Sequence, residues 1–314
     1  MSAEPGLLVD VAHGGRGVEA AFEVPAGRCA ALIGPNGAGK SSLLGMVAGS
    51  VRPTRGRVLV GGRDVTGLPV WRRRVALLAQ RAVLFEHLSV LDNVAFAPSV
   101  AGLGAARSRA AAREWLARVG ASEWAGRRPR ELSGGQAQRV ALAQALAAEP
   151  DVLLLDEPFA AVDVPAAAEL RALLRALLAE QTCVVVTHDY ADVATLADVV
   201  VVLDAGRVAQ TASPEGLAAE PATEFAARLV GLNRIGSELF APTAAAVVLD
   251  PEAPVRHRGT IVGVVSHGEG LRALCRVGES VVEVQIDREL AQRLEPETPV
   301  GVAVREDVAR KGSA

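Results

Sequence analysis

The segment at residues 34–41 constrains the fold of this chain more than any other. It carries the pattern G-x-x-x-x-G-K-S. An apolar run at 29–33 precedes it and another at 43–47 follows, so the sequence predicts a strand, a glycine-rich turn and a helix start. In such a turn, backbone amides and the helix N-terminus converge on an anion, which indicates a nucleoside triphosphate site.

The phosphate contacts are predicted from this loop. Lys40 is expected to reach the β- and γ-phosphates, and the Ser41 hydroxyl to bind Mg²⁺. The alternative, an ordinary glycine turn, is disfavoured by the strand and helix patterns on either side. The predicted nucleotide-binding residues are Gly34, Pro35, Asn36, Gly37, Ala38, Gly39, Lys40, Ser41 and Ser42.

Composition predicts a globular protein of about two domains, with 314 residues of which 50% are apolar. The net charge of −3 and the lack of aromatic residues among the arginine clusters argue against nucleic acid as a partner. The longest aliphatic run, residues 199–203, is too short to span a bilayer, and residues 1–5 do not resemble a signal peptide. The odd number of cysteines, Cys29, Cys183 and Cys275, favours buried reduced thiols and a cytosolic location.

Strand and helix patterns alternate to about residue 210, which is typical of an α/β fold with a largely parallel sheet. Leucines at 170, 173, 174, 177 and 178 predict a helix over 166–180. Strands are expected at 152–155 and 182–186. Because ligands gather where parallel strands end, Asp156, Glu157 and His188 are expected to meet the phosphate loop.

A change of pattern near residue 233 predicts the domain organisation. Residues 1–232 form the predicted nucleotide-binding domain, and glycines and prolines over 233–254 indicate a linker. Alternating apolar residues over 255–314, with a short helix near 287–294, predict a small all-β barrel. About 60 residues is marginal for a lone domain, so this barrel is expected to pack against something or to dimerise.

Two adjacent carboxylates end the strand at 152–155. Asp156 is expected to hold Mg²⁺ through water, and Glu157 to act as the base that orients the attacking water. The alternative is that both only cap the turn at Pro158. Together with Lys40, the pair favours a site that hydrolyses nucleotide.

Residues 132–136, LSGGQ, are identical to the signature of the ATP-binding-cassette (ABC) ATPases. Gln80 resembles the family's Q-loop, residues 161–163 its D-loop with Asp163, and His188 its switch histidine. The resemblance covers residues 7 to about 230. It implies a P-loop cassette with a helical subdomain that carries the signature, ATP and Mg²⁺ as cofactors, and catalytic roles for Glu157, His188 and Gln80.

The same resemblance implies a homodimer of cassettes. In the family, the signature of one cassette closes over ATP held by the other, so its residues contact ATP in trans. Metal ligation is implied for Ser41, Gln80 and Asp156. The signature residues carried over are Ser133, Gly134, Gly135 and Gln136.

Three positions depart from the family pattern. His13 stands where an aromatic residue commonly stacks on adenine, so it is the predicted adenine contact, with an exposed turn histidine as the alternative. Alanine at 160 replaces the serine that commonly begins the D-loop, and Gln144 stands where arginine is common. None of these departures removes a catalytic group.

A single cassette without a spanning segment resembles an importer subunit on the cytoplasmic face of a bacterial or archaeal membrane. Residues 81–94 resemble the segment that receives a permease coupling helix; an ordinary amphipathic surface is the alternative. A solute-binding protein outside the membrane is implied as an indirect partner. Other classes left open are a soluble, non-transport ABC ATPase and an oxyanion sensor.

Residues 257–311 resemble the TOBE/Mop-like, oligomer-binding (OB-like) barrel of molybdate-type importer ATPases. Molybdate or a related oxyanion such as tungstate or sulfate is therefore the expected cargo, with ferric iron, sugar or polyamine as alternatives. The barrel itself is a candidate oxyanion site, and a surface strand pair with scattered charges is the equal alternative. The candidate donors are Ser266, His267, Gly268, Arg272 and Arg276.

Overall fold

The computed structural model describes residues 5–160, 162–267, 270–305 and 310–311. The chain divides into two compact units, residues 1–214 and 215–314. Each has its own buried apolar cluster and is described by itself.

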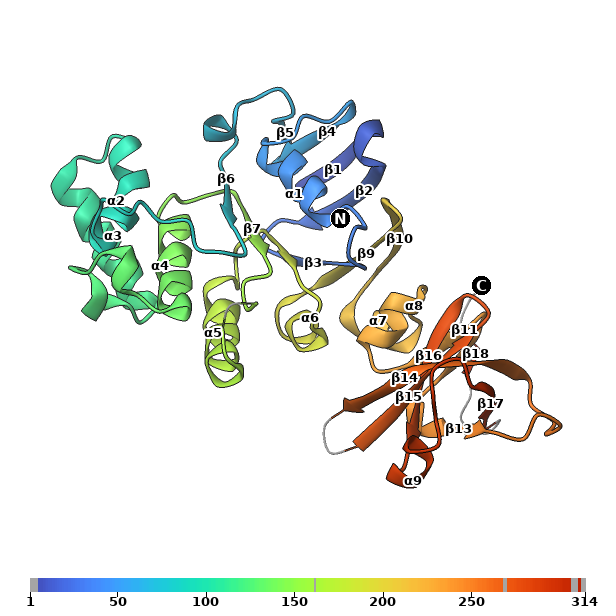
Figure 1. Ribbon diagram of the computed structural model, residues 1–314. Helices are drawn as coiled ribbons and strands as arrows, with labels where there is room; N and C mark the ends of the chain where they lie inside the picture. Colours follow the sequence, from blue (N-terminus) through green and yellow to red (C-terminus); the bar gives the residue numbers. More distant parts are fainter. Residues whose placement is uncertain (1–4, 161, 268–269, 306–309, 312–314) are drawn as a thin grey trace. The chain divides into compact units, whose positions relative to one another are not determined.

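The first unit is built on a ten-stranded sheet whose strands follow the order β5-β4-β1-β2-β10-β9-β3-β8-β7-β6 (Figure 1). Strands β3, β8, β7 and β6 are parallel neighbours, and β9 is parallel to β3. Strands β1, β2 and β4 form an antiparallel extension. The bounds are β1 Pro5–His13, β2 Val18–Pro25, β3 Cys29–Ile33, β4 Arg55–Val60, β5 Arg63–Asp64, β6 Val75–Leu78, β7 Val152–Asp156, β8 Cys183–Val186, β9 Val199–Asp204 and β10 Arg207–Ala212.

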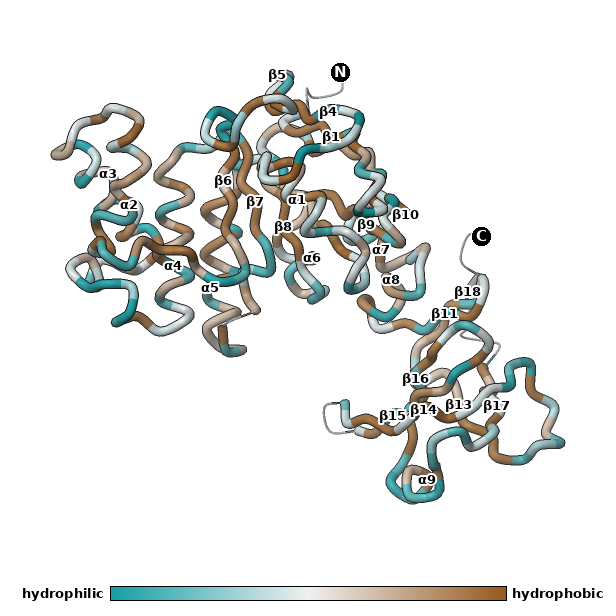
Figure 2. The backbone as a smooth tube through the Cα atoms, turned by 45° about the horizontal axis from the view of Figure 1, so that its top comes forward, coloured by the Kyte–Doolittle hydropathy of each residue, from teal (hydrophilic) through white to brown (hydrophobic). Residues whose placement is uncertain are grey.

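The central strands are buried on both faces because they are continuous apolar runs. Every residue of β3 and β8 is buried, and so are the four aliphatic residues of β7. The tube in Figure 2 is brown along β7 and β8 for this reason. In the register of the parallel strands, Leu32 and Asp156 both pair with Val186. The residues after these three strands therefore meet at one edge of the sheet.

Helices cover the sheet on both sides (Figure 1): α1 lies on one side of the central strands, and α5 and α6 lie on the other. Helices α2, α3 and α4 contact one another, and α4 also contacts the edge strand β6. The bounds are α1 Lys40–Ala48, α2 Val90–Val100, α3 Ala105–Arg118, α4 Gly134–Leu146, α5 Val164–Leu177 and α6 Tyr190–Leu196. Short 3₁₀ turns occur at Gly14–Arg16, Val70–Arg72, Ser122–Trp124 and Pro129–Glu131.

The leucine pattern predicted α5 correctly to within a few residues. The helix begins at Val164, where the Asp163 carboxylate caps the amide of Ala166 (2.9 Å), and ends at Leu177. Leu170 and Leu174 are buried, as the periodicity requires. The α/β class of the first unit is thus confirmed.

The second unit contains a five-stranded antiparallel sheet in the order β13-β17-β14-β15-β16, whose outer strands β13 and β16 also touch. A smaller sheet has the order β11-β12-β18. The strand bounds are β11 Asn233–Ile235, β12 Glu238–Phe240, β13 Ala245–Val248, β14 His257–His267, β15 Gly270–Val277, β16 Ser280–Ile286, β17 Pro299–Val304 and β18 Arg310–Lys311. The helices are α7 Pro214–Ala219, which begins at the boundary between the units, α8 Glu224–Leu229 and α9 Arg288–Ala291, with a 3₁₀ turn at Pro242–Ala244.

The predicted domain scheme of 1–232, 233–254 and 255–314 is corrected by these boundaries. The segment expected as a linker contains β11, β12 and β13, and the units meet at residue 214. Gly236 has φ 59° and lies in the turn of the β11–β12 hairpin. The glycines and prolines of residues 233–254 therefore separate short strands. The Asn233 side chain also bonds both backbone groups of Glu283, which ties β11 to β16.

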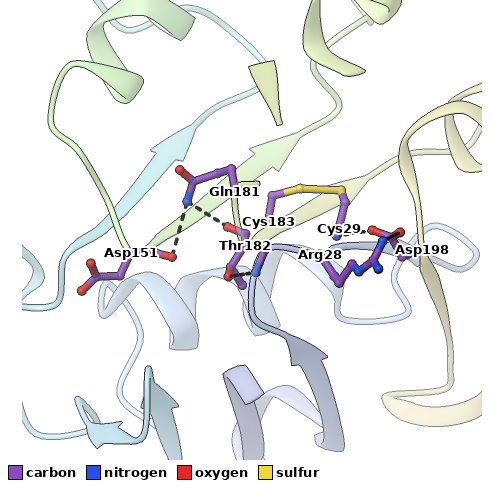
Figure 3. Close-up of a disulfide and its surroundings, with 8 residues drawn as sticks. Arg28, Cys29, Asp151, Gln181, Thr182, Cys183 and Asp198 are labelled. Atoms are coloured by element: carbon purple, nitrogen blue, oxygen red, sulfur yellow. Dashed lines mark hydrogen bonds and ion pairs between the residues drawn. A yellow bond between two sulfur atoms is a disulfide. The ribbon is translucent and has the colours of Figure 1, made fainter. Parts of the chain in front are cut away.

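The prediction of three reduced thiols is wrong for two of them. Cys29 and Cys183 form a disulfide between neighbouring strands (Figure 3). They are partners in the parallel register of β3 and β8, and their Cα atoms are 4.6 Å apart. Cys275 is free and buried, and this burial raises the pKa of its thiol to about 11.

Candidate nucleotide site

The predicted phosphate loop connects β3 to the first residue of α1. Gly39 has φ 100° and a side chain there would meet Val18 Cγ2 at 2.5 Å; at Gly34 it would meet the carbonyl oxygen of Leu203 at 2.1 Å. Both positions therefore require glycine. The pattern of the sequence thus reflects close backbone packing, and the Gly39 N-cap leaves the start of α1 without a side-chain cap.

Lys40 folds back over its own loop. Its Nζ donates hydrogen bonds to the carbonyl oxygens of Gly34 (2.7 Å) and Pro35 (2.9 Å). Burial lowers the pKa of Lys40, and the charges of Glu157 and Asp156 oppose this shift. The ammonium is therefore partly desolvated, within electrostatic reach of both carboxylates, and held by carbonyl groups that a phosphate can replace.

Three catalytic candidates meet at the edge where β7 and β8 end. Gln80 Nε2 donates to Glu157 Oε2 (3.0 Å), and His188 Nδ1 lies 3.7 Å from Glu157 Oε1. Glu157 has φ 47°, an uncommon conformation for a residue with a side chain, while its amide donates to the Val186 carbonyl (3.0 Å). The fold thus brings Gln80, Glu157 and His188 together from three segments far apart in sequence.

The acidic pair carries an electrostatic cost. Burial raises the pKa of Asp156, the neighbouring charge of Glu157 adds to the rise, and Lys40 opposes it. Two adjacent carboxylates at a half-buried strand end are stabilised by an added cation. Asp156 and the Ser41 hydroxyl are hard oxygen donors of the type that Mg²⁺ takes together with water. These residues therefore fit a magnesium ion, although the described residues contain no group of three acidic, histidine or cysteine side chains arranged to hold a metal alone.

The signature residues form the start of α4, where Ser133 and Gln136 cap each other's backbone amides. Ser133 Oγ accepts from the Gln136 amide (3.3 Å), and Gln136 Oε1 accepts from the Ser133 amide (3.0 Å). A hollow of about 440 Å³ lies against them. Its lining comes from residues 120, 124, 133–136, 139, 162, 163, 166 and 170, and none of these described residues belongs to the phosphate loop. Ala161, in the predicted D-loop, lies outside the described residues.

His13 ends β1 and is half-buried. Its Nδ1 atom is shielded from solvent and has no hydrogen-bond partner among the described residues. The predicted adenine contact therefore keeps an unsatisfied ring nitrogen.

The predicted docking segment at 81–94 is an irregular loop leading into α2. The Asn93 side chain is buried and bonds the amide and carbonyl groups of Phe85 (2.7 and 3.1 Å), which fixes the loop. Phe85 lies 4.6 Å from Phe96 by ring centroids, and Val83 is 74% exposed. An apolar surface next to Gln80 is thus present on the described part of the chain.

The candidate oxyanion residues that the structure describes in the second unit lie on both faces of the β14–β15 ladder. His267 pairs with Gly270 and Ser266 with Leu271, so Ser266 and Arg272 lie on opposite faces of the β14–β15 ladder. Arg272 pairs with Glu283 (2.5 Å), which neutralises its charge. Gly268 lies outside the described residues.

The sequence interpretation missed two features around the site. Arg16, in the turn after His13, donates from Nη1 to Ser42 Oγ (3.3 Å). Arg171 on α5 binds Asp192 on α6, beside His188. The position of Arg16 three residues after His13 was a weak sequence signal for the Arg16–Ser42 contact. The Arg171–Asp192 pair depends on how two helices pack, so the sequence pattern carried no signal for it.

These arrangements define the class of protein. The strand, phosphate loop, acidic strand end and signature helix are those of an ATP-binding cassette, and residues 19–160 match the ABC transporter family. The cassette of this chain belongs to that family.

Three relatives found by sequence comparison carry the names of import ATP-binding proteins. The chain is 48% identical over 236 residues to the molybdenum import ATP-binding protein ModC of Mycobacterium tuberculosis, a match that takes in 71% of this chain and 64% of that protein. It is 44% identical over 224 residues to the sulfate/thiosulfate import ATP-binding protein CysA of the same organism (70% and 64%). The match to the spermidine/putrescine import ATP-binding protein PotA of Frankia alni is 44% over 243 residues (73% and 51%).

The chain thus matches somewhat less than two thirds of the length of the first two relatives. Among the residues that the structure describes, no helix has the length and apolar character needed to cross a bilayer.

Proposed function

We propose that this chain is the ATP-hydrolysing subunit of an importer and that its cargo is molybdate or a related oxyanion. The observation that carries the proposal is the meeting of Gln80, Glu157 and His188 beside Lys40 at one edge of the sheet. The names of the relatives support the cargo, because molybdenum and sulfate importers stand among them. Because a spermidine/putrescine importer is also among the relatives, a cationic cargo is the second candidate.

Each residue of the site has a chemical role in this proposal. Lys40 exchanges its carbonyl partners for the β- and γ-phosphate oxygens, and the amides of residues 34–42 surround the phosphates. Glu157 orients the attacking water and accepts its proton, while His188 donates to the γ-phosphate as charge develops there.

Mg²⁺ bound through Ser41, Asp156 and Gln80 supplies charge stabilisation of the phosphates. The Gln80 amide donates to Glu157 Oε2, and the second oxygen, Oε1, faces His188. Oε1 is therefore the oxygen proposed to accept the hydrogen bond from the attacking water, while Gln80 fixes the orientation of the carboxylate.

The proposed active form is a dimer of two such chains. The signature hollow is lined by the signature and D-loop residues of the same chain, without residues of the phosphate loop among those described. A second chain can therefore place its nucleotide against Ser133 and the amides of Gly134 and Gly135. The exposed apolar surface around Val83 and Phe85 is the proposed contact for the permease, at the cytoplasmic face of the membrane.

Substitution of Glu157 tests the hydrolytic role. We expect Glu157→Gln to bind ATP normally and to lower kcat at least ~100-fold, because the amide cannot accept the proton of the attacking water. The matched control is Glu180→Gln, an exposed carboxylate after α5 whose loss leaves kcat unchanged. Full ATP turnover by Glu157→Gln would remove the catalytic assignment.

Cargo is tested by uptake. The chain, co-expressed with its permease and solute-binding partners, is expected to support ATP-dependent molybdate uptake in a host that lacks its own importer. Uptake of spermidine and not of molybdate or sulfate would overturn the oxyanion proposal. Titration of the full chain with molybdate, tungstate and sulfate separately tests whether the second unit, as a proposed TOBE/Mop-like barrel, binds the anion.

A further inference from the structure

A buried polar network lies behind the switch histidine. Asp192, in the first turn of α6, is 3% exposed and makes three contacts with two residues. Its Oδ2 accepts from the Thr187 hydroxyl (2.5 Å), and its Oδ1 accepts from Arg171 Nε (2.7 Å) and lies 2.6 Å from Arg171 Nη2. Asp192 thus joins α5 to the segment that carries His188.

The residues on both sides of His188 belong to this network. The Thr187 hydroxyl, besides donating to Asp192, accepts from the Asp189 amide (3.0 Å). The Asp189 carboxylate caps the amide of Ala191 (2.8 Å) and lies 3.4 Å from Arg171 Nη2. The backbone of residues 187–189 is therefore held by side chains, whereas the His188 side chain is 68% exposed and lies 3.7 Å from Glu157 Oε1.

Arg171 also contacts the segment that follows Glu157. Its guanidinium carbon lies 5.2 Å from the centre of the Phe159 ring. Phe159 is itself buried, two residues after Glu157 and two residues before the predicted D-loop at 161–163. One half-buried cation, Arg171, thus contacts the two segments that carry the base and the switch histidine.

The network and the catalytic candidates share one hollow of about 390 Å³. Glu157 and His188 line it together with Arg171, Thr187 and Asp192. Burial raises the pKa of Asp192, and its bonds to Thr187 and Arg171 oppose the rise. A buried carboxylate with this cost requires these partners, so the geometry of the network is tightly specified.

We propose that Arg171, Asp192 and Thr187 are positioning residues that hold His188 at Glu157 for the chemical step. This inference rests on the proposed ATP hydrolysis. The three residues need not touch the nucleotide; they fix the backbone that presents the imidazole. Since a misplacement of about 1 Å can cost ~100-fold in rate, loss of one hydroxyl in this network is expected to slow hydrolysis measurably.

Thr187 offers the sharpest test because the chain contains a matched threonine. Thr182, just before the opposite end of β8, is also buried, and its hydroxyl accepts from the Gly27 amide (2.9 Å; Figure 3). Thr187→Val and Thr182→Val each remove one buried hydroxyl without changing the shape of the side chain. Both are expected to lower Tm by about 2–4 °C.

Only the substitution next to His188 is expected to change kinetics. We expect Thr187→Val to lower kcat for ATP about tenfold with KM within twofold, Thr187→Ser to restore kcat, and Thr182→Val to leave both constants unchanged. Arg171→Lys, which loses the two-nitrogen contact, should lower kcat as well, whereas Arg175→Lys, exposed on the same helix, should not.

The double variant shows whether Thr187 acts through His188. In a His188→Ala background, adding Thr187→Val is expected to change the residual kcat by less than twofold. An equal tenfold loss in both backgrounds, or equal kcat losses for Thr187→Val and Thr182→Val, would overturn the inference. Absence of ATP turnover in the unmodified chain would instead refute the proposed function.

Discussion

Charged side chains meet different surroundings in the cassette and in the second unit. In the cassette, Lys40 donates to two backbone carbonyls, and burial together with the charge of Glu157 raises the pKa of Asp156. In the second unit, Arg272 pairs with Glu283 and His257 with Glu238. The first arrangement costs stability until a phosphate or cation arrives, whereas the second is already neutralised within the chain.

This difference explains why the sequence pointed to function in one unit and not in the other. A group kept at an electrostatic cost indicates a ligand, and paired groups do not. Arg272 was a candidate anion donor by residue type, and only the β15–β16 pairing revealed its carboxylate partner. Removing single charges in each unit tests whether this difference holds.

The largest effect is expected at Lys40. The chain contains only two lysines, Lys40 in the cassette and Lys311 in the second unit. We expect Lys40→Ala to weaken ATP binding at least ~100-fold, about 3 kcal/mol, because a charge-assisted contact to phosphate is lost. Calorimetric titration with ATP measures this effect, and Lys311→Ala is the matched control with unchanged affinity. Unaltered affinity in Lys40→Ala would contradict the phosphate assignment.

Removal of one carboxylate is expected to raise the Tm of the cassette and to lower the Tm of the second unit. Because the raised pKa of Asp156 means that its charged form is disfavoured by folding, Asp156→Asn should raise the Tm of the cassette by roughly 2–4 °C while hydrolysis is lost. Glu283→Gln leaves Arg272 unpaired and should lower the Tm of the second unit by roughly 4 °C. Scanning calorimetry of both variants checks these shifts. A change of the same sign in both would remove the contrast between the units.

A smaller effect is expected at Arg16, which contacts Ser42 next to the phosphate loop. Arg16→Ala should raise KM for ATP about three- to fivefold with little change in kcat, as for loss of an exposed contact to a charged ligand. Arg52→Ala, another exposed arginine of the cassette, is the control. Equal KM values for Arg16→Ala and the unmodified chain would exclude Arg16 from the site.

Local patterns predicted most of the cassette but not the contacts that cross it. The phosphate loop, the acidic end of β7 and the start of α4 each lie within a few consecutive residues. The spacing of residues along the sequence is therefore enough to predict their local geometry. The Cys29–Cys183 disulfide depends on the register of two strands separated by 154 residues. The pairing of Arg171 with Asp192 similarly depends on the packing of α5 against α6, which neither helix pattern specifies.

The smallest effect is expected in the second unit, in acid. The hydrogen bond from His257 lowers the pKa of Glu238 below its ordinary 4.5, and the charges of His257 and Arg256 add to this. A depressed carboxyl pKa stabilises the folded form above pH 4.5, and this stability is lost as pH falls through the lower folded-state value. We expect Glu238→Gln to cost about 0.5–1 kcal/mol at pH 7 and to reduce the loss of stability between pH 5 and 3, by about the same amount. Urea unfolding across this range measures the difference, with the exposed Glu289→Gln as control. If Glu238→Gln and the unmodified chain lost equal stability in acid, the pair at Glu238 would not be the neutralising contact that distinguishes this unit from the cassette.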